Sequence, residues 1–338
     1  MADKAFQDKN SRGRAEKPDG LSLEDELSPF FLDAGAIMNS KAFRRLRDKA
    51  QVFLLPDQCH VRTRMIHTLE VADAAVKIAR LLGLNADLCQ AIALGHDIGH
   101  TPYGHKGETF ISKVTGKNFD HQIFSAVVAQ RIERKGNGLN LAAETLQGIM
   151  NHSRSMDSLA VDDHLPQEYA VVMLSDKICY SFSDFNDALR YGYLDKKDTG
   201  IFLAMGGNQR ERMETCLEAL IRESAEAGRI SFFASSTAKM FQYLRKWMME
   251  NVYQATENGL NEQVLAMIYE YFRHEPFFAG CDPAILLALL TDKEANCMAE
   301  LFLKSRKPEI EHIKHFGIME IYEQLRRQPI VWWEKPEF

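Results

Sequence analysis

The chain has 338 residues, enough for one large domain or two modest ones, and its 46% hydrophobic and 26% charged residues are typical of a globular protein. The net charge of −6 excludes a general attraction to nucleic acid or anionic membranes, so a polyphosphate site must be a local basic patch. Six cysteines without Cys-x-x-Cys spacing argue against a zinc knuckle or a disulfide framework, and no apolar run could span a bilayer. We therefore expect a cytoplasmic protein that has no membrane partner.

The predicted elements are helices throughout, which makes the expected fold class all-α. Residues 1–27 are rich in charged residues and glycine and predict a flexible N-terminal arm. Residues 64–82 carry apolar side chains at spacings of three and four and stop at Gly83. Asn85 then predicts the N-cap of a short helix that reaches His96.

The pattern continues to the C-terminal region. Helices are expected over 121–134 and 141–151, with the Gly-rich turn 135–138 between them. Pro166 fits the first turn of a long helix that ends near Arg190. Further amphipathic helices follow from Asn208 to Arg306, and no convincing alternating strand pattern is present.

The neighbouring residues His96 and Asp97 are the most informative pair in the chain. Adjacent residues within a helix point in different directions, but at a helix end both can reach one metal ion. Imidazole and carboxylate together suit Mn, Fe, Zn, Ni or Co rather than an all-oxygen calcium site. The plain alternative is a favourable histidine at a helix C-terminus beside an incidental aspartate. Eight of the eleven histidines fall between residues 60 and 164, and this clustering favours a site.

With His67 upstream and Asp176 downstream, the order His…His-Asp…Asp resembles the HD superfamily of metal-dependent phosphohydrolases. Longer motifs resemble the dGTPase-like deoxynucleoside triphosphate triphosphohydrolases within it. These motifs are Ser28-Pro29-Phe30, Ser40-Lys41-Ala42-Phe43-Arg44-Arg45-Leu46, Lys49-Ala50-Gln51-Val52-Phe53, Arg62-Thr63-Arg64 and Gly99-His100-Thr101-Pro102-Tyr103-Gly104-His105-Lys106-Gly107-Glu108. The resemblance is clear from about Ser28 to Gly192, and beyond it rests on fragments such as Leu290-Thr291-Asp292-Lys293.

The resemblance implies an HD-domain helical bundle over residues 28–200 and a helical C-terminal region over 201–338 that packs on it. It also implies a divalent metal ion, drawn from Mn, Mg, Fe, Co, Ni or Zn, with Mn or Mg favoured for activity. The expected metal ligands, carried by three helices, are His67, His96, Asp97 and Asp176. Four protein ligands leave positions open for water and phosphate, which is typical of a catalytic site.

His105 and Glu108 lie three residues apart, on one face of a helix that begins after Gly104. The resemblance gives His105 the acid–base role and Glu108 a supporting role, whereas the plain alternative is a solvated first turn. His121, in a Phe-Asp-His-Gln segment that resembles another family element, is expected beside the metal-bound water.

Substrate contacts follow from the same resemblance. Gln51 and Val52 match a pair that contacts the sugar, and Val52 would leave no space for a 2′-hydroxyl. Tyr180 would stack on the deoxyribose, and Asp184 would bond its 3′-hydroxyl. Arg45 and Arg64 belong to a basic cluster that could clamp a triphosphate, although such a cluster can equally be an ordinary charged helix face.

The sequence departs from the family pattern at two places. Ala34 and Ala36 stand where the family often carries arginines, and Ser183 stands where a histidine is usual before the sugar-binding aspartate. The two missing arginines put the phosphate or subunit contacts of that N-terminal segment in question.

We expect hydrolysis of a deoxynucleoside triphosphate, such as dGTP, to a deoxynucleoside and inorganic triphosphate, through attack of metal-activated water on the α-phosphorus. One alternative is an HD phosphohydrolase for nucleoside monophosphates or cyclic nucleotides. Another is a non-catalytic nucleotide-sensing or nucleic-acid-binding HD protein, although the acidic net charge does not favour single-stranded nucleic acid as a partner. The resemblance further implies a homo-oligomer, from dimer to hexamer, and activation by a bound nucleotide.

Overall fold

The computed structural model describes residues 1, 4–14, 27–52, 62–153, 159, 161–162, 164–195, 200–253, 260–304 and 308–336. In this part of the chain the regular structure is helical, and a single isolated bridge between Ala50 and Thr63 is the only β-pairing. The predicted all-α fold class is therefore confirmed. Residues 2–3 and 15–26 of the predicted N-terminal arm lie outside the described residues.

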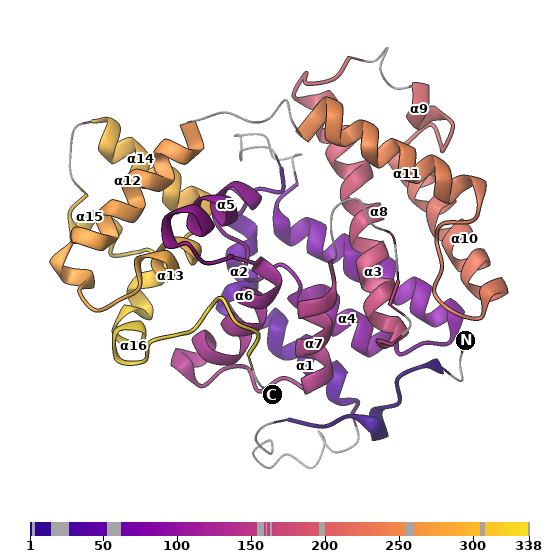
Figure 1. The fold of residues 1–338 in the computed structure, drawn as a ribbon, viewed down its shortest axis with the longest axis horizontal. Coiled ribbons are helices and arrows are strands. Elements are labelled where there is room, and N and C mark those ends of the chain that lie inside the picture. The colour runs from indigo at the N-terminus through magenta and orange to yellow at the C-terminus, as the bar shows by residue number, and fades with distance from the viewer. Residues whose placement is uncertain are drawn as a thin grey trace. The chain divides into compact units, whose positions relative to one another are not determined.

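The α-helices are short to medium in length and follow one another through the chain (Figure 1). They are α1 (Pro29–Met38), α2 (Lys41–Arg45), α3 (Arg64–Leu82), α4 (Ala86–Gly95), α5 (His105–Thr115), α6 (His121–Val127), α7 (Ala143–Asn151), α8 (Gln167–Arg190), α9 (Gly200–Leu203), α10 (Gln209–Ala227), α11 (Ser236–Met248), α12 (Leu260–His274), α13 (Pro283–Ala288), α14 (Asp292–Leu303), α15 (Ile310–Ile313) and α16 (Tyr322–Arg327).

The helix ends agree well with the sequence signals. Helix α3 spans the predicted residues 64–82, and the side chain of Asn85 accepts a hydrogen bond from the main-chain N–H of Leu88 at the start of α4. Pro166 directly precedes α8, as expected. The predicted helix 121–134 differs: α6 ends at Val127 and continues as a π-helical turn, Val128–Ile132, and a 3-10 turn, Glu133–Gly136.

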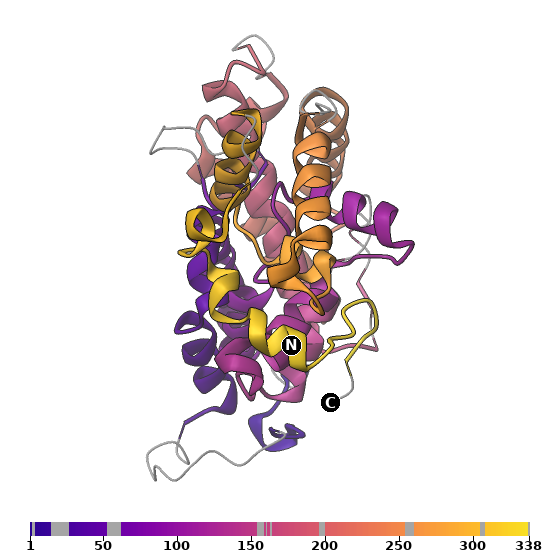
Figure 2. The same ribbon diagram turned by 90° about the vertical axis from the view of Figure 1, so that its left-hand side faces the viewer.

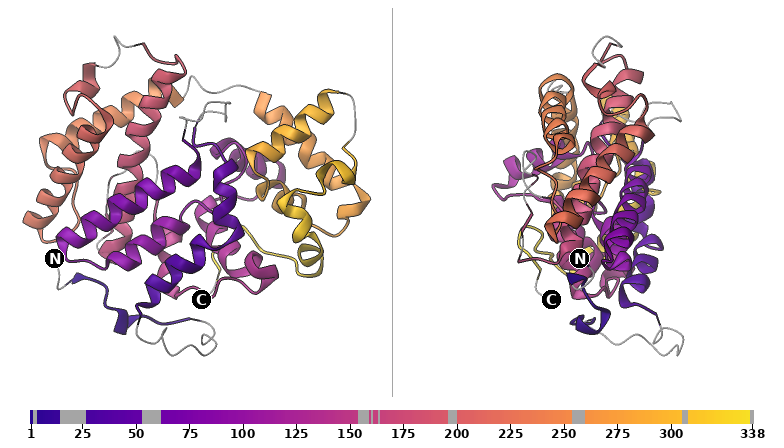
Figure 3. Two further views of the ribbon diagram at one scale, coloured as in Figure 1. Left: turned by 180° about the vertical axis from the view of Figure 1, so that it is seen from behind. Right: turned by 90° about the vertical axis from the view of Figure 1, so that its right-hand side faces the viewer.

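The chain divides into two compact units, each assembled from three segments. The first unit contains Met1–Gly35, Ile66–Gly95 and Ala142–Glu257. Helix α8 is its centre, and α4, α7, α10 and α11 pack against it (Figures 1 and 3). Gly148 lets α7 approach α4 closely, because an added Cβ would lie 2.2 Å from the Ile92 side chain.

The second unit contains Ala36–Met65, His96–Leu141 and Asn258–Phe338. Helix α12 packs against α5, α13 and α14 in this unit, and the helices from its third segment can be followed in orange and yellow in Figure 2. Buried apolar side chains such as Leu286, Leu287 and Met298 form its core. The predicted boundary between an HD core and a C-terminal region at residue 200 stays a prediction.

No helix in the described part of the chain combines the length and the apolar character that a membrane span requires.

Candidate active site

Asp97 sits in a buried turn directly after α4, where it is only 3% exposed. Its Oδ2 lies 2.7 Å from Nη1 of Arg64, and its Oδ1 lies 3.4 Å from Nε2 of His96. Burial alone would raise the pKa of Asp97, but the neighbouring His96, Arg64, His100 and His121 lower that pKa well below its ordinary value. The carboxylate is therefore held in the ionised form that a metal ligand needs.

Gly99 and Ser125 fix the shape of this turn. The main-chain N–H of Gly99 donates to Oγ of Ser125 on α6, and that hydroxyl donates to the carbonyl of His96, both at 2.9 Å. A Cβ on residue 99 would lie 2.3 Å from the main-chain nitrogen of Ser125, so only glycine permits this approach. The glycine at position 99 is thus explained by close packing of the turn against α6.

One carboxylate oxygen contacts three histidines beside this turn. Oε1 of Glu108 lies 3.1 Å from Nδ1 of His100, 3.1 Å from Nδ1 of His121 and 3.2 Å from Nδ1 of His105. The ligand-type atoms of these four residues all lie within 4.8 Å of one another, and such a group could hold a metal ion. We call His100, His105, Glu108 and His121 the histidine cluster.

The two buried histidines of this cluster have opposite protonation preferences. The rings of His100 and His121 stack with centroids 4.1 Å apart, so both cannot readily carry a positive charge. Burial, Arg64 and His121 lower the pKa of His100 well below its usual value. Burial also acts against charging His121, but Glu108 and Asp97 outweigh it and raise the pKa of His121 to about 9.

Glu108 is the anion that compensates this positive charge. Its burial tends to raise its pKa, but His121, His100 and His105 lower it well below the ordinary value. The side chain of His105 is 63% exposed, in contrast to the buried histidines. His105 is therefore the member of the histidine cluster that a ligand can reach most easily.

The other two predicted metal ligands meet within the first unit. Nε2 of His67, on α3, lies 2.9 Å from Oδ1 of Asp176, on α8. His67 is 1% exposed. Imidazole and carboxylate donors of this kind fit a divalent transition metal, and the same donor types recur at His96 and Asp97. The protein therefore carries the donor chemistry of an HD-type metal centre.

The two predicted sugar contacts on α8 have partners that sequence reasoning missed. Nη2 of Arg245 donates to the hydroxyl of Tyr180 at 3.0 Å, and the hydroxyl of Tyr253 donates to Oδ2 of Asp184 at 2.9 Å. Both new residues follow the region of clear family resemblance. The sequence does contain a signal for Arg245, because this charged residue lies beside the apolar stripe of α11 that includes Leu244 and Met248.

The predicted phosphate-binding arginines already have protein neighbours. Arg64 is 4% exposed, and its Nη2 donates to the carbonyl of Gln51 at 3.3 Å. Burial lowers the pKa of Arg45, while Glu133 and Glu294 raise it, which places its guanidinium near both carboxylates. Gln51 and Val52 are both half-buried. Their contacts with substrate stay predictions.

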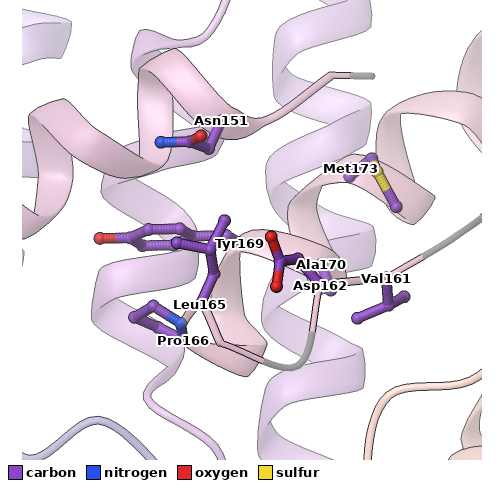
Figure 4. A pocket seen from close by; sticks show the side chains of 8 residues that line it. All are labelled: Asn151, Val161, Asp162, Leu165, Pro166, Tyr169, Ala170 and Met173. Carbon is purple, nitrogen blue, oxygen red and sulfur yellow. The ribbon is translucent and has the colours of Figure 1, made fainter. Parts of the chain in front are cut away.

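A separate small pocket lies in the first unit, at the start of α8 (Figure 4). It has room for about one water molecule. Its lining residues are Asn151, Val161, Asp162, Leu165, Pro166, Tyr169, Ala170 and Met173. None of the predicted metal or substrate contacts lines it, so it plays no part in the candidate site.

Comparisons with known proteins show which family the chain belongs to. The family model of the HD domain matches residues 64–181, which include all four predicted metal ligands and the histidine cluster. A deoxyguanosinetriphosphate triphosphohydrolase-like protein of Caldanaerobacter subterraneus subsp. tengcongensis is 37% identical over 274 residues, covering 79% of this chain and 78% of the relative. The chain belongs to this dGTPase-like family.

Two other similar members of the dGTPase-like family come from Clostridium tetani and Desulfatibacillum aliphaticivorans. The first is 36% identical over 259 residues, covering 74% of this chain and 74% of the relative. The second is 37% identical over 255 residues, covering 72% of this chain and 73% of the relative. The protein is accordingly an HD-domain phosphohydrolase by family.

Two of the residues at which the sequence departs from the family pattern, Ala34 and Ser183, are buried in the structure. Ala34 is 2% exposed, so a long arginine has no room at that position. The neighbouring Asp33 instead pairs with Arg14, at 2.6 Å between Oδ1 and Nη1. Ser183, which replaces a family histidine, is fully buried and donates its hydroxyl to the carbonyl of Cys179 on its own helix at 2.9 Å.

Proposed function

We propose that the protein hydrolyses deoxynucleoside triphosphates, with dGTP as the type substrate, to a deoxynucleoside and inorganic triphosphate. The observation that carries this proposal is the histidine cluster, in which Glu108 contacts three imidazoles just beyond the ionised Asp97. Such a concentration of proton-transfer groups beside metal-ligand donors supports phosphoryl chemistry rather than a structural role. Family membership supports the triphosphohydrolase class.

His67, His96, Asp97 and Asp176 would hold the divalent ion, with Mn or Mg favoured for activity. When bound, the ion supplies Lewis-acid chemistry at the phosphoryl group and lowers the pKa of water. In support, the side chain of His67 lies beside that of Asp176, and the side chain of His96 lies beside that of Asp97. The low pKa of Asp97 keeps one of these ligands anionic throughout the neutral range.

His105 is proposed as the proton donor to the departing sugar oxygen. Its Nδ1 lies 3.2 Å from Oε1 of Glu108, and donation to that oxygen would favour the tautomer with the proton on Nδ1. Nε2 is then the nitrogen that gains and releases a proton toward substrate. Glu108 would orient the His105 ring, and the protonated His121 adds positive charge beside it.

The sugar and phosphate contacts complete the proposed site. Tyr180 and Asp184 would bind the deoxyribose, with their positions supported by Arg245 and Tyr253. Gln51 and Val52 would contact the sugar, and Arg45 and Arg64 would balance triphosphate charge. Arg64 would do so while it keeps its ion pair with Asp97.

The deciding experiment is hydrolysis of each of the four dNTPs and four NTPs with Mn²⁺, Mg²⁺, Co²⁺ or no metal. Products are separated by ion-exchange chromatography, and Asp97→Ala serves as the blank. We expect a deoxynucleoside and intact triphosphate from dNTPs, lost in the variant. Nucleoside monophosphates and cyclic nucleotides are assayed in parallel. Release of inorganic phosphate from the former, or opening of the latter, without triphosphate release from any dNTP would replace this proposal with the monophosphate or cyclic-nucleotide alternative. Saturable binding without turnover would indicate a sensor.

Two further properties belong to the same proposal. We propose that the chain forms a homo-oligomer, between dimer and hexamer, and that a second nucleotide activates it in the cytoplasm. Light scattering coupled to gel filtration measures the first property. Hydrolysis of pairwise dNTP mixtures, compared with each nucleotide alone, measures the second.

A further inference from the structure

Asp292 joins two segments of the candidate active site that lie far apart in the sequence. It is 1% exposed, at the N-terminus of α14 in the second unit. Its Oδ2 accepts a hydrogen bond from the main-chain N–H of Ala50 at 2.7 Å, and its Oδ1 accepts one from the main-chain N–H of Tyr103 at 2.9 Å. Each carboxylate oxygen of Asp292 thus accepts a hydrogen bond from the main chain of one of the two segments.

The Tyr103 segment has a conformation that needs external support. Tyr103 has a φ of 59°, in the left-handed region that non-glycine residues seldom adopt. Gly104 follows with a φ of 60°, and α5 begins at His105. The turn is also tightly packed, because a Cβ on Gly107 would lie 2.4 Å from the carbonyl oxygen of Pro102. A small shift at Tyr103 would therefore move the start of α5.

The segment around Ala50 contacts Arg64 and the turn that carries His100. The carbonyl of Lys49 accepts from the main-chain N–H of Arg64 at 3.0 Å, and Nη2 of Arg64 donates to the carbonyl of Gln51. The Lys49 ammonium also donates to the carbonyl of His100. Residues 49–51 thus contact both the ion-pair partner of Asp97 and the turn that carries His100.

Helix α14 is a fixed support for both segments. Thr291 and Glu294 form a capping box around its N-terminus, which holds Asp292 in place. One helical turn further on, Oδ1 of Asn296 accepts a hydrogen bond from the hydroxyl of Tyr103 at 2.7 Å. Tyr103 is therefore held by α14 at its main chain and at the tip of its side chain.

We propose that Asp292 is a positioning residue, which holds the turn that presents His105 and Glu108 in register with the Gln51–Arg64 segment. This inference rests on the proposed function, because it assigns Asp292 a part in the geometry of that reaction. Asp292 accepts hydrogen bonds from the main chain of Ala50 and Tyr103, and the charges of Lys49 and Arg64 also act on its carboxyl group. It therefore acts through other residues. The C-terminal region thereby contributes to the site through α14.

The test compares Asp292→Asn with Asp282→Asn. Asparagine keeps the shape of Asp292 but has one acceptor oxygen, so either Ala50 or Tyr103 loses its partner. Asp282 is a matched control in the same unit, because its oxygens accept from the main-chain N–H of Ala284 at 2.8 Å and the indole of Trp332 at 2.9 Å. Neither of these hydrogen bonds of Asp282 involves the Tyr103 turn or residues 49–51.

Two readouts are needed, namely steady-state kinetics and amide hydrogen exchange followed by mass spectrometry. We expect Asp292→Asn to lower kcat by about 10- to 100-fold with a smaller change in KM, because misplaced catalytic groups affect the chemical step. Exchange should rise in peptides that cover residues 49–51 and 101–108. Asp282→Asn should leave kcat and these two peptides unchanged. Equal losses of kcat in both variants, or unchanged exchange in these peptides, would overturn the inference.

A second variant covers the case in which Asp292→Asn does not fold. Tyr103→Phe removes only the bond to Asn296 and should raise exchange over residues 101–108 to a smaller extent; unchanged exchange there would also overturn the inference. Should the wild-type protein release no triphosphate from any nucleotide, the proposed function fails on its own. The hydrogen-exchange comparison still decides whether Asp292 holds this turn.

Discussion

Asp97 and Arg64 form a buried ion pair, with 2.7 Å between Oδ2 and Nη1. The pair directs one carboxylate oxygen toward the guanidinium and leaves the other beside the imidazoles of His96 and His100, at 3.4 and 3.7 Å. Arg64 and His67 lie three residues apart on α3, so one helix carries both the partner of Asp97 and another proposed ligand. The ion pair therefore places the guanidinium of Arg64 directly beside one of the proposed metal ligands.

Asp97→Ala should remove bound metal and abolish triphosphate release, because it deletes a proposed ligand. It should also lower the free energy of unfolding of the metal-free protein by about 3–5 kcal/mol, because it leaves Arg64 buried without its carboxylate. Elemental analysis measures the bound metal, and urea denaturation measures the free energy of unfolding. Asp73→Ala, which breaks the exposed Asp73–Lys77 pair on α3, should cost less than about 1 kcal/mol. Full metal content in Asp97→Ala would contradict the ligand assignment.

Sequence reasoning located the helices where local signals mark their ends. Gly83 ends α3, Asn85 caps α4 and Pro166 precedes α8, and each acts through backbone chemistry confined to one turn. The predicted helix 121–134 is helical through Ile132, and only its end differs from the prediction, for the same reason. Arg134 and Lys135 adopt left-handed φ values of 51° and 57°, which their residue types do not indicate. Tertiary packing, rather than local propensity, sets that conformation.

Some features of the candidate site could likewise be predicted from local motifs, whereas others depend on tertiary contacts. The order of His67, His96, Asp97 and Asp176 and the spacing of His105 and Glu108 could be read from motifs. The sharing of one Glu108 oxygen by three histidines could not, because it depends on how α5 and α6 meet the turn after α4. Tyr253 and Asp292 were missed because they act through contacts with segments distant in the sequence.

His105→Gln should lower kcat by about 10²- to 10⁴-fold, the usual contribution of a positioned acid or base. The fold should be retained, because the His105 side chain is 63% exposed. Thr109→Ala, one turn further along α5 and also exposed, should leave kcat close to that of the wild type. Steady-state kinetics and thermal unfolding of both variants make the comparison. A His105→Gln enzyme with normal kcat would exclude the proposed proton-transfer role.

Tyr253→Phe should raise KM for dNTPs on the order of tenfold. The substitution removes the hydroxyl that donates to Asp184 at 2.9 Å, and hydrogen bonds to charged groups contribute about 1.5–3 kcal/mol. Asp184 would then be less well oriented for the sugar. Tyr243→Phe on α11 is the control, because Tyr243 is 60% exposed. An unchanged KM in Tyr253→Phe would show that the Asp184 contact does not serve substrate binding.

Glu223 provides a test of stability that is independent of activity. It lies on α10 and accepts hydrogen bonds from the main-chain N–H groups of Phe233, Ala234 and Ser235 and from the hydroxyl of Ser231, at 2.7–3.0 Å. Burial opposes the charged form, but these four donors outweigh it and lower the pKa of Glu223 from 4.5 to about 2. The carboxylate thus fixes the connection that leads into α11.

Because the folded-state pKa of Glu223 lies below the unfolded value, its stabilisation is complete above about pH 4.5 and is lost as the pH falls toward 2. The difference in free energy of unfolding between wild type and Glu223→Gln should approach about 3 kcal/mol at pH 7 and shrink between pH 4.5 and 2. Urea denaturation at pH 7, 5, 4 and 3 measures this difference. Glu226→Gln, an exposed neighbour on α10, should show no such trend. A difference that stays constant with pH would mean that the lost hydrogen-bond geometry, and not the carboxylate charge, stabilises this connection.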